Sequence, residues 1–194
     1  SSQLGGKETP ADTARVLERQ VAAIVWRTYA QAGLEEMAAG TRVPVVNALS
    51  DDFHPCQLVA DLLTIREHKG ELKGLTLSFF GDGRSNMAHS YVLAAVTAGM
   101  HVRVASPESY MPREDVIASA HAIAATTGGS VTLMTDAGAA AEGADVIVTD
   151  TWVSMGKEEE KLARIRDLGD YKVTSEIMAK ATPEAIFIHC LPAD

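Results

Sequence analysis

The stretch Ala144-Asp145-Val146-Ile147-Val148-Thr149-Asp150-Thr151-Trp152-Val153-Ser154-Met155-Gly156 decides the fold, because an apolar, β-branched run in it stops at an acid and opens into a polar loop. Val146 to Val148 form a short continuous apolar block, typical of a strand buried on both faces of a parallel sheet. In open α/β sheets ligands bind beyond the carboxyl ends of such strands, so Asp150, Ser154 and Met155 are candidate site residues. A carboxylate there suits a cationic amine. The competing interpretation is that Asp150 only caps the following turn.

The sequence on both sides of this stretch alternates strands and helices, which predicts an α/β protein with parallel sheets. Residues 74–194 are expected to form one domain. Its further strands are predicted at 75–80, 101–105, 131–134 and 185–188, the last of them buried, and its helices at 87–98, 112–127, 136–142, 158–168 and 174–181. The charges of the helix at 158–168 are interpreted as a solvated face.

Residues 1–52 are predicted to be part of a second sheet domain, followed by an interdomain helix within 53–73. This part contains a helix that begins near Thr9-Pro10, a buried strand at 21–26, a helix at 31–39 and a strand at 43–48. Arg27 follows the first strand, so its guanidinium is placed at the edge of the sheet where ligands bind. An arginine that is merely solvated at the strand end is the alternative.

Composition excludes several classes of protein. The 194 residues are 46% hydrophobic, and no apolar run approaches the roughly 20 residues that cross a bilayer. The net charge of -9 argues against binding to nucleic acid or to an anionic membrane. Cys56 and Cys190 lack the CxxC spacing of a zinc or disulfide framework, and no secretory signal opens the sequence. A cytoplasmic protein that acts on small molecules is therefore expected.

A polar cluster precedes the helix expected at the domain boundary: Asp51-Asp52-Phe53-His54-Pro55-Cys56-Gln57. Pro55 suits the first helical position, which places His54 and Gln57 at a helix N-terminus, where free N–H groups favour an anion. The imidazole and the amide could together polarise a carbonyl group. A capping arrangement without function is the alternative.

A glycine turn follows the strand at 75–80: Gly81-Asp82-Gly83-Arg84-Ser85-Asn86. Strand, glycine turn and helix are typical of a mononucleotide-binding unit, and Glu108 stands at a plausible distance for a ribose contact. Asn86 argues against a dinucleotide site, because the fingerprint requires a small residue there. Asn86 instead could donate to a small carboxylate, or could serve as a plain helix N-cap.

The last predicted strand ends in His189-Cys190-Leu191-Pro192. Cys190 is thus a second polar group at the carboxyl end of a strand, and it lies beside Asp150 if the two strands are neighbours. A buried cysteine with a purely structural role is the alternative.

Read together, four clusters resemble the ornithine carbamoyltransferase family, part of the aspartate/ornithine carbamoyltransferase superfamily. They are His54-Pro55-Cys56-Gln57, Gly81-Asp82-Gly83 with Asn86, Asp150 to Gly156, and His189-Cys190-Leu191-Pro192. The resemblance covers the whole sequence. It implies two Rossmann-like parallel-sheet domains, the first only partly present, in a subunit of a cytoplasmic homotrimer. The implied reaction moves the carbamoyl group from carbamoyl phosphate to the side-chain amine of L-ornithine, giving citrulline and phosphate, without a metal or organic cofactor.

The resemblance also assigns roles to particular residues. His54, Asp150 and Cys190 are implied as catalytic. The implied ornithine contacts are Asn86, Asp150, Ser154 and Met155, and the implied carbamoyl phosphate contacts are Gln3, Arg27, His54, Pro55, Cys56, Gln57, Cys190 and Leu191.

The sequence also departs from the family pattern. No Ser-Thr-Arg-Thr phosphate loop occurs in it, and Ser85 stands where the family commonly has asparagine. The resemblance therefore implies a sequence truncated at both ends. An inactive ligand-binding or assembly fragment, and a transcarbamoylase for a related amine, remain as alternatives.

Overall fold

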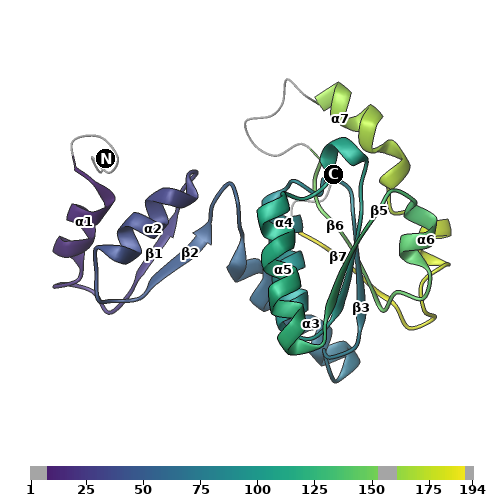
Figure 1. Ribbon diagram of the computed structural model, residues 1–194, viewed down its shortest axis with the longest axis horizontal. Helices are drawn as coiled ribbons and strands as arrows, with labels where there is room; N and C mark the ends of the chain where they lie inside the picture. The colour runs from purple at the N-terminus through teal and green to yellow at the C-terminus, as the bar shows by residue number, and fades with distance from the viewer. Residues whose placement is uncertain (1–7, 153–160, 191–194) are drawn as a thin grey trace. The chain divides into compact units, whose positions relative to one another are not determined.

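The computed structural model describes residues 8–152 and 161–190, and it divides the chain into two compact units, Ser1–Cys56 and Gln57–Asp194. Figure 1 shows the elements of each unit. The division falls inside helix α3 (Pro55–Lys69), so nearly all of the helix that the sequence placed between the domains belongs to the second unit. The chain is of mixed α/β class with parallel sheets, as the sequence predicted.

The first unit pairs two strands with two helices: α1 (Pro10–Leu17), β1 (Ile24–Arg27), α2 (Gln31–Ala39) and β2 (Val45–Leu49). Strands β1 and β2 are parallel. Helix α1 begins as expected, because Pro10 needs no N–H partner in the first turn and the Thr9 hydroxyl accepts from the Asp12 N–H at 3.1 Å. Ala14, Ile24 and Met37 form its small core.

The prediction of a buried strand at 21–26 was wrong in extent and in burial. The strand begins at Ile24, and Val25 is 68% exposed. Its residues alternate between buried and exposed positions, so in this unit the small sheet buries one face only.

The second unit is built on a five-stranded parallel sheet of order β5-β4-β3-β6-β7. The strands are β3 (Thr76–Phe80), β4 (His101–Ala105), β5 (Ser130–Met134), β6 (Val146–Thr149) and β7 (Ile186–His189). From β3 the chain adds β4 and β5 on one side of the sheet, and it then adds β6 and β7 on the other side of β3. The order therefore reverses between β3 and β6, which makes the carboxyl ends of these two strands the topological switch point of the sheet.

Helices cover both faces of this sheet. Figure 1 shows α4 (Asn86–Thr97) and α5 (Glu114–Thr127) on one face and α6 (Ala137–Ala141) on the other. The shorter elements are η1 (Glu108–Tyr110), α7 (Lys161–Leu168), η3 (Gly169–Tyr171) and α8 (Ser175–Met178). Val146, Ile147 and Val148 are fully buried, as the apolar run predicted, because β6 is central and covered on both sides.

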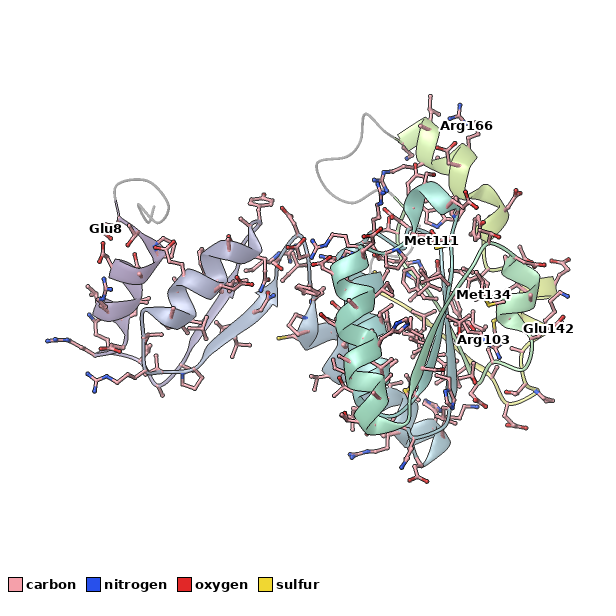
Figure 2. The ribbon with its side chains drawn as sticks, viewed as in Figure 1. Glu8, Arg103, Met111, Met134, Glu142 and Arg166 are labelled. Atoms are coloured by element: carbon pink, nitrogen blue, oxygen red, sulfur yellow. The ribbon has the colours of Figure 1, made fainter. Side chains whose placement is uncertain are left out.

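A charged residue of β4 closes the end of α6. Arg103, which Figure 2 labels together with Glu142, donates to the carbonyl oxygens of Ala140 at 3.2 Å and Glu142 at 2.6 Å. These carbonyls lie at the C-terminal end of the helix, where they have no partner within the helix, so a cation there stabilises it.

The prediction that the last strand is buried was also wrong. β7 lies at the edge of the sheet, and Phe187 is 48% exposed. Its apolar sequence resembles that of a central strand, but only β6 pairs with it.

In the described part of the chain, no helix is long and apolar enough to span a membrane.

Candidate functional site at the carboxyl edge of the second sheet

Asp150 and Cys190 meet just beyond the ends of β6 and β7. The strands are neighbours, with Thr149 paired to His189, so the next residue of each chain segment emerges at the same edge. The Cys190 thiol donates to Asp150 Oδ1 at 2.7 Å, and the Thr151 N–H donates to the same oxygen at 2.7 Å. Asp150 Oδ2 accepts from no donor among the described residues. The sequence predicted that Cys190 lies beside Asp150 if their two strands are neighbours, and the structure confirms this.

Burial controls the protonation of this pair. It raises the pKa of the Asp150 carboxyl above its ordinary value, an effect that the thiol and the Thr151 N–H oppose by favouring the charged form. Burial, together with the hydrogen bond to Asp150, raises the pKa of the Cys190 thiol to about 12. At neutral pH Cys190 is therefore a hydrogen-bond donor rather than a thiolate nucleophile.

The glycine turn after β3 is fixed by close contacts. Gly81 has a φ of +120°, a conformation that disfavours any residue with a Cβ. A Cβ on Gly83 would lie 2.7 Å from the Tyr110 carbonyl oxygen and 2.9 Å from Pro112 Cδ. The turn leads into α4, whose N-cap is Ser85, since its hydroxyl accepts from the Ala88 N–H at 3.1 Å. The N-cap reading of Asn86 was therefore wrong, because Asn86 is the first helical residue.

Asp82, at the centre of this turn, forms a buried ion pair with Arg164 of α7. Arg164 Nη1 donates to Asp82 Oδ2 at 2.6 Å, and the two side chains are 9% and 8% exposed. The guanidinium also lies over the Tyr110 ring, 5.6 Å from its centroid. The interpretation of the charges at 158–168 as a solvated face was wrong for Arg164. Arg166 fits the expectation, since it is exposed and points into solvent in Figure 2.

Gln57 belongs to a second buried network. Its amide Nε2 donates to Asp61 Oδ1 at 3.0 Å, and the Tyr91 hydroxyl of α4 donates to Asp61 Oδ2. Burial, and then the nearby Asp61 carboxylate, raise the pKa of Tyr91, so its hydroxyl keeps its proton. Cys190 and Asp150 contribute to the same shift, which places this network near the carboxylate and thiol pair.

The first unit holds the other predicted anion-binding residues. Arg27 is the last residue of β1 and is exposed, at the strand end where it was expected. His54 is half-buried and directly precedes α3, and Pro55 is the first helical residue as predicted. The loop before His54 is fixed at Ser50, whose hydroxyl donates to Gln31 Oε1 at 2.8 Å and accepts from the Phe53 N–H at 3.1 Å. Cys56 is exposed, and its thiol donates to the Asn47 carbonyl at 3.3 Å.

Four predicted contacts, Gln3, Ser154, Met155 and Leu191, lie outside the described residues. In residues 8–152 and 161–190, no group of three or more His, Cys, Asp and Glu side chains is arranged to hold a metal ion. Sequence reasoning missed Asp61, Tyr91, Asp82 and Arg164 as residues that hold the site together. A usable signal existed only for Asp61, which stands four positions after Gln57 and so shares its face of α3.

These features define a class of α/β protein. The second unit is a doubly wound α/β domain that presents a carboxylate, a thiol and a helix N-terminus at its switch point, and it follows a smaller parallel-sheet unit. Two family models match the chain. Residues 1–67 match the carbamoyl-P binding domain of aspartate/ornithine carbamoyltransferase, and residues 73–194 match the Asp/Orn binding domain. The chain therefore belongs to the aspartate/ornithine carbamoyltransferase family.

Similar proteins support the assignment. The chain is 72% identical over 194 residues to an ornithine carbamoyltransferase of Clavibacter sepedonicus. The aligned region covers 100% of this chain and 63% of that protein. It is 65% identical over 192 residues to the ornithine carbamoyltransferase of Leifsonia xyli, in an alignment that covers 99% of this chain and 62% of that protein. The chain thus spans less than two thirds of the length of these relatives.

Solved structures give the same result. The ornithine carbamoyltransferase of Pyrococcus furiosus superposes with a TM-score of 0.92 at 46% identity, over 99% of this chain and 61% of that one. The anabolic ornithine carbamoyltransferase of Campylobacter jejuni superposes with a TM-score of 0.90 at 34% identity, over 100% of this chain and 64% of that one.

Proposed function

We propose that the protein to which this chain belongs is an ornithine carbamoyltransferase. It transfers the carbamoyl group of carbamoyl phosphate to the side-chain amine of L-ornithine and releases citrulline and phosphate. The observation that carries the proposal is the Asp150–Cys190 pair at the switch point of the domain that matches the Asp/Orn binding model.

The charge of this edge favours ornithine over aspartate as the acceptor. Arg164 pairs with Asp82, whereas the described hydrogen-bond donors to Asp150 are neutral groups, the Cys190 thiol and the Thr151 N–H. Asp150 Oδ1 accepts from Cys190 and Thr151, and no donor among residues 8–152 and 161–190 reaches Oδ2, which can therefore accept an N–H from an amine. A cationic side chain is attracted to such a position, whereas the second carboxylate of aspartate is repelled.

The chemistry assigns complementary tasks to the proposed residues. The ammonium group first gives up one proton to solvent, and the neutral amine nitrogen then attacks the carbamoyl carbon. The bond from that carbon to the phosphate oxygen breaks, and the second proton of the amine leaves with the phosphate. Asp150 orients the amine, and the protonated thiol of Cys190 holds Asp150 in place. We propose that His54 and Gln57 bind the carbamoyl group and that Arg27 stabilises the leaving phosphate. The same resemblance supports roles for Gln3, Pro55, Cys56, Leu191, Asn86, Ser154 and Met155 in substrate binding.

A citrulline assay on the full-length protein tests the proposal. Carbamoyl phosphate is supplied with L-ornithine and, in a parallel reaction, with L-aspartate. Citrulline formation with ornithine and no carbamoyl transfer to aspartate is the expected result. Transfer to aspartate alone, or to neither amine, would contradict it.

The 63% coverage of the relatives favours a second candidate for the 194-residue polypeptide alone, namely a fragment that binds ligand without turnover. We expect the activity of this polypeptide to lie more than about tenfold below that of the full-length protein. It contains no Ser-Thr-Arg-Thr phosphate loop, and each charge-assisted phosphate contact that is lost costs on the order of 1.5–3 kcal/mol of binding free energy. Citrulline production by the polypeptide at the full-length rate would contradict this expectation.

We further propose a homotrimer in the cytoplasm that serves arginine metabolism. Light scattering during size-exclusion chromatography of the full-length protein tests the trimer. The ratio of the forward rate to the rate of citrulline phosphorolysis tests whether the enzyme works in arginine biosynthesis or in catabolism.

A further inference from the structure

Gln57, Asp61 and Tyr91 form a hydrogen-bonded chain that joins α3 to α4 within the second unit. Asp61 is buried at 6% exposure, and each of its oxygens accepts one hydrogen bond: Oδ1 from Gln57 Nε2 at 3.0 Å and Oδ2 from the Tyr91 hydroxyl. Tyr91 is fully buried. A carboxylate that accepts two donors in a buried place is firmly held, because the removal of either donor would leave a polar atom unsatisfied.

This chain determines which way the Gln57 amide faces. A carboxylate can only accept hydrogen bonds, so the Gln57 NH₂ group must face Asp61 and the carbonyl Oε1 must face the other way. In the described part of the chain no donor reaches Oε1. Without Asp61 the amide could turn over and present NH₂ instead, since the two orientations of a glutamine amide are nearly equal in shape.

We propose that Asp61 is a positioning residue, which fixes Gln57 so that its carbonyl oxygen accepts an N–H from the bound acyl phosphate. This inference rests on the proposed function, and it explains how the site would distinguish carbamoyl phosphate from other acyl phosphates. Carbamoyl phosphate carries an NH₂ group on its carbonyl carbon, whereas acetyl phosphate carries a methyl group of similar size. Only the first can donate to Oε1, so the orientation imposed by Asp61 selects for carbamoyl phosphate.

The first experiment measures this selection in the full-length protein. The inhibition constant of acetyl phosphate is divided by the KM of carbamoyl phosphate, for the wild type and for Asp61→Ala. We expect this ratio to fall about tenfold or more in the variant, the effect of one lost hydrogen bond to a buried group, with little change in the KM of ornithine. A general loss of structure would change both ligands equally, so an unchanged ratio would overturn the proposal.

Asp145→Asn is the matched control. Asp145, like Asp61, accepts a hydrogen bond, in its case from the backbone N–H of Thr76 at 2.8 Å, but it precedes β6 and so lies at the opposite edge of the sheet. We expect this variant to lose stability without any change in the ratio. A fall in the ratio equal to that in Asp61→Ala would overturn the proposal, because it would show that any lost carboxylate has this effect.

A second experiment decides the matter even where Asp61→Ala does not fold. Gln57→Glu places a carboxylate against Asp61, and we expect kcat/KM for carbamoyl phosphate to fall. Adding Asp61→Asn supplies an amide donor to the new glutamate. The double variant should therefore have a kcat/KM for carbamoyl phosphate at least about tenfold higher than that of Gln57→Glu alone. A double variant that is no better than Gln57→Glu alone would overturn the proposal. In both experiments the wild type must form citrulline, and a wild type that forms none would refute the proposed function instead.

Discussion

Asp150 and Cys190 are 40 positions apart in the chain, and they meet because β6 and β7 are parallel neighbours. Each residue by itself has an ordinary structural explanation. Together they give a buried carboxylate with one oxygen occupied by the thiol and a backbone N–H. Two predictions follow from the protonation of this pair.

The first prediction is that Asp150→Asn in the full-length protein lowers citrulline turnover strongly while the fold is retained. Burial disfavours the charged carboxylate, so the folded state binds its proton more tightly than the unfolded state does. Stability should therefore fall as pH rises from the ordinary pKa of 3.8 to the raised value, and the variant should lose this part of the pH dependence. Turnover and thermal unfolding at several pH values check both statements.

The exposed Asp170 provides the control, since Asp170→Asn should change neither turnover nor the pH profile. A normal citrulline rate in Asp150→Asn, with unchanged ornithine affinity, would remove Asp150 from the site.

The second prediction concerns the two thiols. Cys190 is half-buried with a pKa raised to about 12, so almost none of it is thiolate at pH 8, whereas Cys56 is exposed. We expect iodoacetamide to alkylate Cys56 first and Cys190 only slowly, as measured by mass spectrometry of peptides over time. Preferential alkylation of Cys190 would show that its thiol is more accessible and more acidic than the structure indicates.

Among the elements of the second unit, α7 is tied to the sheet by one buried ion pair. Arg164 reaches Asp82 in the turn between β3 and α4 and also donates to the Trp152 carbonyl at 3.4 Å. The pair therefore links α7 to the two loops that leave the switch point. Because the pair is buried, its loss should be felt far more than that of a surface pair.

We predict that Arg164→Leu destabilises the protein by about 3–5 kcal/mol, because it leaves the Asp82 carboxylate buried without its partner. The joint replacement Arg164→Leu with Asp82→Leu should recover much of this loss, since no unpaired charge then remains. Urea unfolding measures both free energies.

Arg166→Leu is the matched control on the same helix. Arg166 pairs with Asp167 at 2.9 Å but is 78% exposed, so its replacement should change stability by less than about 1 kcal/mol. Equal losses for Arg164→Leu and Arg166→Leu would contradict the view that burial makes the difference.

At the scale of the whole molecule, the two units differ in how completely they bury their sheets. The first has two strands and leaves Val25 and Tyr29 68% and 81% exposed. The second surrounds β3 and β6 with paired strands and with helices on both faces. A two-stranded sheet has marginal stability by itself, whereas a central buried strand opens only when its domain unfolds.

We therefore predict that, in the 194-residue polypeptide, amide protons of β1 and β2 exchange much faster than those of β3 and β6. Hydrogen exchange followed by mass spectrometry checks this, with the full-length protein as the comparison. Equal protection of the two sheets in the polypeptide would show that the first unit is stable without further partners.

The sequence by itself determined the α/β class, the position of nearly every strand and helix, and the residues at the strand ends. Local chemistry suffices for these features. The apolar run at 146–148 can only be a buried segment, Pro10 and Pro55 favour helix starts, and Asp150 stands where such a strand must end.

Only the tertiary structure decided the strand order, the exposure of β7 and the burial of Arg164. Whether β7 lies at an edge, and whether Arg164 is solvated or buried, depends on which distant elements pack against them. The same holds for the chain from Gln57 through Asp61 to Tyr91, whose members come from two helices. Periodicity reports only which face of an element is apolar, whereas pairing between distant residues is set by the packing of the whole domain.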